Sequence, residues 1–322
     1  MHRILARQSL SPNVTRLDVH APRIAEIRQP GQFVIVHLAE NSERIPLTVA
    51  DSDPATGRIT LVIQAVGKST NELVALNPGD FIRDIAGPLG HPTEMIETGH
   101  ALCIGGGVGT AVVHPIAQGL HRRNVRVTSV IGGRSKEWVI FEPELQRYGK
   151  VVVCTDDGSY GEKGLVTKKL NELLAAGRAI DFVLAVGPVP MMRAVAQVTG
   201  PRGIKTMVSL NSIMVDGTGM CGGCRVLLGN TSQFACVDGP EFDASLVNFE
   251  VLMQRNAMYR EKECKSLEQF ELHKAEELAH IRAELATKEA EIARLKAELQ
   301  SLDNAALESA ALDGTEKEAT HV

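Results

Sequence analysis

The chain has 322 residues, which corresponds to roughly two domains of about 150 residues each. Hydrophobic residues make up 44% and charged residues 23%, a balance that excludes a globally disordered chain. The net charge of −5 excludes a generally basic nucleic-acid-binding surface, so no nucleic-acid partner is expected. The charge is uneven, because residues 261–322 hold 15 Asp and Glu against 8 Lys and Arg, a net of −7 that leaves +2 on residues 1–260. All 14 prolines lie at or before Pro240, so two different kinds of polypeptide are joined in this chain.

Three features that the sequence lacks narrow the class of protein. The N-terminal residues contain no apolar segment typical of a signal peptide. No uninterrupted apolar run reaches the roughly 18 residues of a membrane-spanning helix, so no membrane span is expected. Six cysteines are too few for a disulfide scaffold, and the grouping of Cys221, Cys224 and Cys236 indicates metal binding in a chain that we expect to be cytoplasmic.

Residues 1–98 alternate between short extended runs and turns. Two turn signals, Asp53–Gly57 and Asn77–Asp80, contain the Pro, Asp and Gly residues that turns favour. Many short strands at this spacing predict a β-barrel or a sandwich. The predicted strands are Asn13–His20, Gln32–His37, Arg58–Val66 and Phe81–Ile85.

Two segments of this half are candidate ligand contacts. Arg44–Thr48 places an arginine and a hydroxyl on one extended strand, where they can meet a pyrophosphate and a ring system, and a surface arginine is the alternative. Val66–Thr70 leads into a helical Asn71–Leu76 and can bind an anion through backbone amides and hydroxyls. An ordinary helix cap is the alternative for Ser69 or Thr70.

Residues 99–208 change to an alternation of strand-like and helical runs. This alternation predicts a doubly wound parallel sheet with helices on both faces. The strand-like runs are Ala101–Ile104, Arg126–Ile131, Val151–Thr155 and Phe182–Val186, and the helical runs are Ala111–Arg122, Val166–Ala176 and Met191–Thr199.

Three loops follow predicted strands at the edge of the sheet where ligands bind in such folds. Gly105–Thr110 joins a strand to a helix N-terminus, a geometry that binds phosphate, although its spacing is not the standard G-x-G-x-x-G fingerprint. Gly187–Met191 follows another strand and opens another helix, and Thr155–Gly164 is the third loop. A tight turn without a ligand is the alternative for the first loop, and a solvated connector is the alternative for the third.

The most specific motif is the spacing D-x4-C-x2-C-x11-C formed by Asp216, Cys221, Cys224 and Cys236. Plant-type 2Fe-2S proteins use C-x4-C-x2-C followed by a distant cysteine, so Asp216 stands where the first cysteine would be. The glycines between the motif residues let backbone amides turn toward cluster sulfides. A zinc site and a cluster with a non-protein fourth ligand are the alternatives, although a single C-x2-C pair is a poor zinc pattern.

A strongly helical stretch runs from about residue 257 to 303. Apolar residues recur there at steps of three and four. With Leu278 at heptad position a, the d positions hold Ile281, Leu295 and Leu302, and the charged Lys288 occupies the remaining d position. The pattern fits a coiled coil, through which the chain self-associates or binds a partner, and it equally fits a single amphipathic helix packed on the body or on a partner. Residues 304–322 are expected to be disordered.

Similarity to a known family is carried by Arg44–Thr48, Gly105–Gly109, Asp156–Gly161 and Ser209–Cys224, extended by Phe234–Asp243. Together these segments resemble the small subunit of NADH-dependent reduced-ferredoxin:NADP oxidoreductase, also called the sulfide dehydrogenase small subunit, in the ferredoxin reductase superfamily. The dihydroorotate dehydrogenase electron-transfer subunit is a near relative. The resemblance covers about residues 1–255, and the helical extension is not part of the family pattern.

The resemblance implies FAD in the barrel, a nicotinamide nucleotide on the parallel sheet and a 2Fe-2S cluster on the cysteine motif. FAD contacts are implied at Arg44, Pro46, Leu47, Thr48, Gly67, Ser69 and Thr70. Nucleotide contacts are implied at Gly105, Gly106, Gly107, Val108, Gly109, Thr110, Gly187, Pro188 and Met191, with Asp157 as a further cofactor contact. Cluster ligands are implied at Asp216, Cys221, Cys224 and Cys236, and no catalytic side chain is demanded.

The implied function is hydride transfer from NADH to FAD, followed by single-electron transfer through the cluster to a larger flavin and iron-sulfur subunit. Ferredoxin is reached through that complex, and family pairs can bifurcate electrons. An Asp ligand favours this branch over the dihydroorotate branch, which uses cysteines throughout. Arg134 either meets a 2′-phosphate or is a solvated loop residue, so NAD(H) and NADP(H) are not distinguished.

Two rival functions stay open. The chain is alternatively an electron-transfer subunit of dihydroorotate dehydrogenase or glutamate synthase, or a coiled-coil assembly subunit with a vestigial redox body.

The expected domains are an FAD-binding antiparallel β-barrel at 1–98, an NAD(P)-binding α/β domain at 99–208, a 2Fe-2S module at 209–256, a helical extension at 257–303 and a disordered tail at 304–322.

Overall fold

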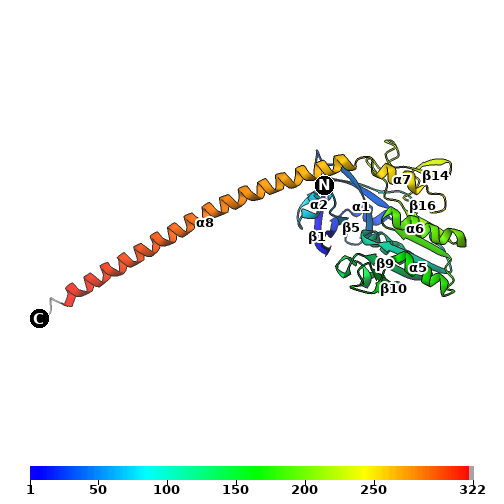
Figure 1. The fold of residues 1–322 in the computed structure, drawn as a ribbon. Coiled ribbons are helices and arrows are strands. Elements are labelled where there is room, and N and C mark those ends of the chain that lie inside the picture. Colours follow the sequence, from blue (N-terminus) through cyan, green and yellow to red (C-terminus); the bar gives the residue numbers. More distant parts are fainter. Residues whose placement is uncertain (319–322) are drawn as a thin grey trace. The chain divides into compact units, whose positions relative to one another are not determined.

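The computed structural model describes residues 1–318 and divides the chain into two compact units. The first unit is Met1–Glu263 and the second is Cys264–Val322. No helix within residues 1–318 combines the length and the apolar character that a membrane span requires. The first unit contains two large sheets and a small hairpin, and the second consists of helix (Figure 1).

The N-terminal sheet has seven antiparallel strands in the order β6-β1-β2-β5-β4-β3-β7 and curls into a nearly closed barrel (Figure 1). Alternate residues of β2 and β5, such as Leu17, Val19 and Ile59, are fully buried inside it because successive side chains of a strand point to opposite faces. The predicted barrel is therefore confirmed. Its elements are β1 (His2–Ser11), β2 (Val14–His20), α1 (Pro22–Ile27), β3 (Phe33–His37), β4 (Arg44–Asp53), β5 (Arg58–Gln64), α2 (Lys68–Ala75), β6 (Phe81–Ile82) and β7 (Asp84–Leu89).

The second sheet follows the order β11-β10-β9-β8-β12-β13-β16, and all its strands are parallel except the edge strand β16. Helices α3 and α4 cover one face and α5 and α6 cover the other, as the sequence predicted. The strand order reverses between β8 and β12, which is where doubly wound sheets bind ligands. The elements are β8 (His100–Gly106), α3 (Thr110–Arg122), β9 (Arg126–Gly133), α4 (Glu142–Gln146), β10 (Lys150–Thr155), β11 (Glu162–Lys163), α5 (Val166–Ala175), β12 (Phe182–Val186), α6 (Val189–Thr199), β13 (Lys205–Ser209) and β16 (Glu241–Asp243).

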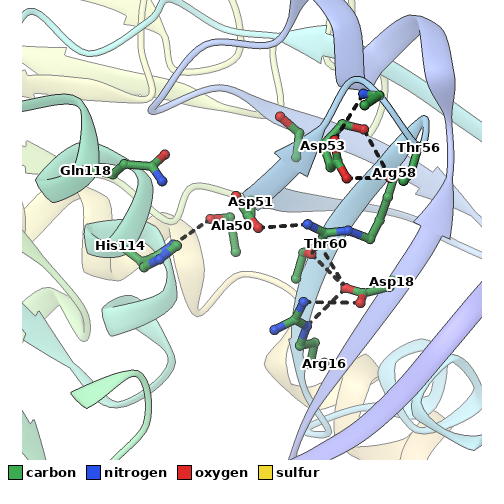
Figure 2. A network of polar contacts seen from close by, with 12 residues as sticks. Arg16, Asp18, Ala50, Asp51, Asp53, Thr56, Arg58, Thr60, His114 and Gln118 are labelled. Atoms are coloured by element: carbon green, nitrogen blue, oxygen red, sulfur yellow. Dashed lines mark hydrogen bonds and ion pairs between the residues drawn. The ribbon is translucent and has the colours of Figure 1, made fainter. Parts of the chain in front are cut away.

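A polar network in the barrel joins it to α3 (Figure 2). The Arg58 guanidinium donates to Asp51 at 3.1 Å and lies 3.5 Å from Asp18. One residue before Asp51, the carbonyl oxygen of Ala50 accepts a hydrogen bond at 3.0 Å from Nδ1 of the buried His114. Burial lowers the pKa of His114 below its ordinary value, so the ring stays neutral and donates from Nδ1. This contact fixes β4 against the helix that follows the glycine loop.

The cysteine motif lies in a segment that packs on both sheets. A hairpin of β14 (Arg225–Leu228) and β15 (Thr231–Phe234) lies beside α7 (Phe249–Asn256), as Figure 1 shows. Strand β16 pairs with β13, so this segment also supplies the last strand of the parallel sheet. Gly217 has φ +77°, and a Cβ there would lie within 2.8 Å of Ile35 of β3 and 2.7 Å of Leu89 of β7. The loop before the cysteines therefore packs directly on the barrel.

The second unit is made by α8, which spans Arg260–Glu318. The helix continues past residue 303, where the sequence analysis ended the helical extension and placed a disordered tail. The continuation has a physical reason, because residues 304–313 contain no proline or glycine and are rich in Ala and Leu, which are strong helix formers. The last part of that tail, residues 319–322, lies outside the described residues.

Candidate functional site

The first unit contains a cavity of about 1030 Å³ at the point where its barrel, its parallel sheet and the cysteine segment meet. Single-ligand pockets usually span about 300–1,000 Å³, so this volume is large enough for more than one bound group. The barrel contributes β4 and β5 to its lining, the parallel sheet contributes the loops after β8, β9 and β12, and the cysteine segment contributes residues 209–212, Met214 and Pro240.

Both predicted glycine loops reach the cavity at the switch point of the sheet. Gly106, Gly107, Val108 and Gly109 line it, together with Gly187, Pro188 and Met191. Gly107 has φ +55°, and a Cβ there would meet no atom within 4 Å, so its backbone is open to a ligand. Neither α3 nor α6 has a side-chain cap at its N-terminus, so the positive end of each helix dipole is open to an anion in the cavity. The edge of the cavity therefore fits a phosphate.

The remaining residues of these loops have packing roles. Gly105 and Thr110 do not line the cavity, and a Cβ on Gly105 would lie 2.9 Å from the Thr110 backbone. A Cβ on Gly109 would lie 2.4 Å from the Val186 carbonyl oxygen, so glycine is needed there for the two loops to pack together. The assignment of Gly105 and Thr110 as nucleotide contacts stays a prediction.

The predicted flavin contacts divide into two groups. Pro46, Leu47 and Thr48 of β4 line the cavity. Arg44 is exposed and lies outside the lining, and so do the three residues at the start of α2: Gly67, Ser69 and Thr70. Of these, the Thr70 hydroxyl oxygen accepts hydrogen bonds at 3.0 Å from the backbone N–H groups of Val66 and Gly67. The hydroxyl therefore caps the start of α2, which was the alternative for this residue.

Two cavity residues that the sequence did not single out carry polar atoms without a partner. The Oδ1 atom of Asn13 and the Oγ atom of Ser212 are buried, and neither forms a hydrogen bond within the part of the chain that the structure describes. A buried polar group without a partner costs about 1–3 kcal/mol. Both residues line the cavity, so a polar ligand bound there, such as an isoalloxazine or a nucleotide, fits as the source of the missing bonds.

The loops after β9 and β10 place Arg134 and Asp156 at the cavity but leave Asp157 outside its lining. Asp156 lines the cavity, whereas Asp157 is exposed and its carboxylate accepts hydrogen bonds from the backbone N–H and the hydroxyl of Ser159. Arg134 also lines the cavity, and its guanidinium carbon lies 5.8 Å from the centre of the Trp138 ring. The assignment of Asp157 as a cofactor contact stays a prediction. Arg134 and Trp138 together form a further part of the cavity wall.

The four predicted cluster ligands come together as two pairs. The thiol of Cys221 lies 3.0 Å from Oδ1 of Asp216, and the Sγ atoms of Cys224 and Cys236 are 3.1 Å apart. No group of three or more such donors converges on a single point among the described residues. Each iron of a 2Fe-2S cluster takes two protein donors, because bridging sulfides fill its other positions. Two pairs of donors therefore fit such a cluster better than they fit a single tetrahedral zinc ion.

The two pairs differ in their exposure and in their electrostatics. Cys224 and Cys236 are buried, whereas Cys221 is exposed. Burial, with the neighbouring Cys224 thiol, raises the pKa of the Cys236 thiol to about 12, so metal binding there must displace a proton. Hydrogen bonds from the Cys221 thiol and the Thr218 hydroxyl hold the pKa of the Asp216 carboxyl well below its ordinary value. Asp216 is therefore an anionic oxygen donor on the exposed side of the motif.

Two family models match parts of the chain that this geometry singles out. Residues 2–93, which form the barrel, match the oxidoreductase FAD-binding domain. Residues 211–248, which contain all four donors, match the iron-sulfur cluster binding domain of dihydroorotate dehydrogenase B.

Relatives match most of the chain. The dihydroorotate dehydrogenase B (NAD(+)) electron transfer subunit homolog of Thermotoga maritima is 43% identical and covers 84% of this chain and 95% of that protein. The corresponding electron transfer subunit of Bacillus caldolyticus is 34% identical and covers 76% of this chain and 96% of that protein. A chain in the structure of the NADH-dependent reduced ferredoxin-NADP oxidoreductase is 42% identical with a TM-score of 0.80, over 84% of this chain and 98% of that one. The chain therefore belongs to the family of dihydroorotate dehydrogenase B electron transfer subunits and their homologues, and it is an FAD and iron-sulfur electron-transfer subunit of the ferredoxin-NADP oxidoreductase type.

Proposed function

We propose that residues 1–98 hold FAD, residues 99–208 hold a nicotinamide nucleotide and residues 209–256 hold a 2Fe-2S cluster. The observation that carries this arrangement is the shared cavity, which is lined at once by β4, by two uncapped helix N-termini and by the segment that leads into the cysteine motif. A hydride donor, a flavin and a cluster must lie close together for electrons to pass. The cavity supplies that proximity for the nucleotide and the flavin, and Met214 in its wall lies two residues before the first proposed cluster ligand.

Each wall of the cavity has a defined task in this arrangement. Pro46, Leu47 and Thr48, with the unpartnered atoms of Asn13 and Ser212, hold the flavin. The amides of Gly107–Gly109 and the start of α6 hold the nucleotide phosphates. When bound, the nicotinamide, flavin and iron-sulfur groups supply hydride transfer and one-electron transfer. No side chain of this chain is required to donate or accept a proton.

The cluster rests on Asp216, Cys221, Cys224 and Cys236, with the first two on one iron and the last two on the other. This division follows the two close pairs of donors. The loop that carries Gly217 packs on β3 and β7, which keeps the cluster next to the barrel. Cys221 is exposed, so the Asp216–Cys221 pair is the side from which an electron leaves for a partner.

The partner is a larger subunit, because relatives of this chain are electron transfer subunits of larger enzymes. We infer that this subunit carries a further flavin and further iron-sulfur clusters, and that ferredoxin exchanges electrons with the complex rather than with this chain alone. We place the complex in the cytoplasm, where the six cysteines of the chain, all of them free, are kept reduced.

The test is an absorption spectrum and a metal analysis of the full chain, purified without oxygen. We expect flavin bands together with the long-wavelength shoulders of a 2Fe-2S cluster. A chain without flavin bands or without cluster shoulders contradicts the proposal and favours the coiled-coil assembly subunit with a vestigial redox body.

The role of Asp216 has its own test. Asp216→Cys should keep the cluster and change its midpoint potential and EPR signal, because thiolate donates more electron density to iron than carboxylate does. An unchanged potential and EPR signal would exclude Asp216 as a ligand. Co-purification from the native source separates the ferredoxin-linked complex from dihydroorotate dehydrogenase and glutamate synthase, since each predicts a different large subunit.

A further inference from the structure

Helix α8 carries a row of large apolar side chains that are not covered by any other described residue of its own unit. Single exposed apolar residues are common on protein surfaces, but a continuous row along one helix marks an interaction surface. The row begins at Leu278 and ends at Leu302, and its side chains are 45% to 67% exposed. Its members are Leu278, Ile281, Leu285, Ile292, Leu295, Leu299 and Leu302.

The spacing of this row is that of a coiled-coil seam. With Leu278 at position a, the row fills every a position up to Leu299 and every d position except Lys288. A helix that packs on a globular body needs a wider stripe, with apolar residues also at e or g. In α8 those flanking positions are charged, with glutamate at each g position from Glu277 to Glu298 and Arg282, Glu289 and Lys296 at e. The apolar face is therefore narrow enough for one or two partner helices and too narrow for a sheet.

The charges on either side of the seam decide which helix can cover it. In a parallel pair, each g residue meets the e residue five positions later on the partner helix. Glu277 then meets Arg282 and Glu291 meets Lys296, which are attractive pairs. Glu284 meets Glu289 and Glu298 meets Asp303, which are repulsive pairs, although Glu284 also contacts His280 of its own helix at 3.5 Å.

An antiparallel pair is electrostatically worse. In that orientation g residues face g residues, and all four g positions from 277 to 298 are glutamate. Like charges would therefore meet along one whole side of the seam. The helix supplies its own complementary charges only when a second copy lies parallel to it.

We propose that a second copy of this chain packs along α8 as a parallel, in-register, two-stranded coiled coil over residues 278–302. The two chains enter the coil from the same end. The coil therefore links two copies of the first unit, one from each chain, through residues 257–263. Each of these units keeps its own cavity, since all the residues that line it belong to one chain. The coil is thus an assembly device that is separate from the proposed electron path.

The mass of the full-length chain in solution tests the pairing, measured by light scattering during size-exclusion chromatography. We expect twice the chain mass of 34.7 kDa. The double variant Leu285→Glu with Ile292→Glu places charges in two a layers and should weaken self-association by more than about 100-fold. The matched control Ala286→Glu with Ala293→Glu adds the same charges one residue further on, at outward b positions, and should stay dimeric.

Three results would overturn the proposal: a monomeric or trimeric wild-type chain, a dimeric Leu285→Glu/Ile292→Glu variant, or a control that dissociates equally. Far-ultraviolet circular dichroism and the flavin spectrum of each variant show whether the first unit is folded. A monomeric double variant that keeps its flavin bands supports the proposal even if α8 alone loses helix. Loss of the flavin in the wild-type chain would count against the proposed function and not against the coil.

Orientation is tested by cross-linking. A Leu299→Cys variant brings two thiols together only in a parallel pair, where the a layers face each other. Mild oxidation with diamide joins the two thiols as a disulfide, and the two electrons and two protons pass to the diamide. Cys264 is exposed and falls on an a position of the same frame, so each cysteine variant is made in a Cys264→Ser background. We expect a reducible dimer band that is absent from the Cys264→Ser chain treated alike. Cross-linking only when Leu299→Cys chains are mixed with Ile281→Cys chains would show an antiparallel pair and refute the proposal.

Discussion

Residues 1–263 and α8 use their apolar side chains in opposite ways. In the first unit, large side chains such as Leu102, Ile116 and Phe182 are fully buried by neighbours from the same chain. In α8, side chains of similar size remain about half exposed. The first unit is thus complete as a single chain, whereas the helix has a surface that requires another molecule. Composition reflects this contrast, because 28 of the 29 glycines lie in residues 1–260, where loops must approach each other and their ligands closely.

From this contrast we infer that electron transfer and assembly are separable in this chain. Changes in the first unit should alter cofactor content, stability or nucleotide affinity without altering the oligomeric state. Changes in the seam of α8 should alter the oligomeric state without altering the cofactor content, the stability or the nucleotide affinity of the first unit. Four variants test this separation.

The largest expected effect is the loss of the cluster in Cys224→Ala. This substitution removes a buried donor from the Cys224–Cys236 pair and leaves one iron with a single protein ligand. We expect the iron content and the cluster shoulders to disappear while the chain remains dimeric. Cys264→Ala, at an exposed cysteine in α8, is the control and should keep its iron. Retention of the cluster in Cys224→Ala would rule out this ligand assignment.

A smaller effect is expected from Glu241, whose buried carboxyl accepts a hydrogen bond at 2.8 Å from Thr93 and has an unpartnered Oε2 atom. Burial, opposed by the Thr93 bond and reinforced by Glu94, raises the pKa of Glu241 from 4.5 to about 7. Between these values the folded state binds more protons than the unfolded state does. The free energy of unfolding therefore falls as the pH rises through this window, by up to about 3 kcal/mol.

Glu241→Gln should remove this pH dependence, because glutamine is uncharged and still accepts the Thr93 bond. Urea unfolding at pH 5 and pH 8, followed by flavin fluorescence, measures the effect. We expect the variant to be the more stable protein at pH 8 and close to the wild type at pH 5. Glu250→Gln, at an exposed glutamate of α7, is the matched control. Equal pH dependence in Glu241→Gln and the wild type would contradict the assignment.

Among variants of α8, Lys288→Leu should strengthen the proposed coiled coil. Lys288 occupies the one d position of the seam that is not apolar, so leucine there completes the row. Burying a leucine in place of a lysine should stabilise the dimer by about 1–2 kcal/mol. The measurement is the dissociation constant from sedimentation equilibrium. Arg294→Leu removes the same charge at an outward c position and should leave the constant nearly unchanged.

The smallest expected effect concerns Arg134, which lines the cavity beside Trp138. A guanidinium at the end of β9 favours a 2′-phosphate over a 2′-hydroxyl. Arg134→Ala should therefore weaken NADP(H) about fivefold more than NAD(H), which corresponds to roughly 1 kcal/mol. Equilibrium titrations with both nucleotides give the ratio, and Arg193→Ala on the exposed side of α6 is the control. Equal losses for both nucleotides would show that Arg134 does not contact the 2′ position.

The sequence predicted best those parts of the site that depend on local patterns. The four predicted cluster donors lie within 21 residues, so a loop and a hairpin bring them together as two close pairs. The glycine loops were predicted because each follows an apolar strand and precedes a helix. Strands β2, β5 and β12 were likewise visible as apolar runs bounded by turn residues.

The parts that the sequence missed depend on contacts between distant segments. Asn13 belongs to no motif, and Ser212 was given no role although it lies in the Ser209–Cys224 segment. Both line the cavity because the barrel and the cysteine segment pack on the same edge of the sheet. Strand β16 has three residues and is defined by its pairing with β13 rather than by its own pattern. Strand β1 lies in the region predicted to hold short strands but was not singled out, because most of its side chains are exposed, which removes the alternation that marks a half-buried strand.

We infer that electrons pass from a nicotinamide nucleotide through the flavin to the cluster within a single copy of residues 1–263. The direct test is an anaerobic titration of the purified chain with NADH or NADPH, without any partner subunit, followed by absorption and low-temperature EPR. We expect one of the nucleotides to bleach the flavin bands and also to produce the EPR signal of a reduced 2Fe-2S cluster, in the dimer and in the monomeric Leu285→Glu/Ile292→Glu variant alike. A flavin that is reduced while the cluster stays oxidised, although dithionite reduces it, would show that electrons do not follow this path.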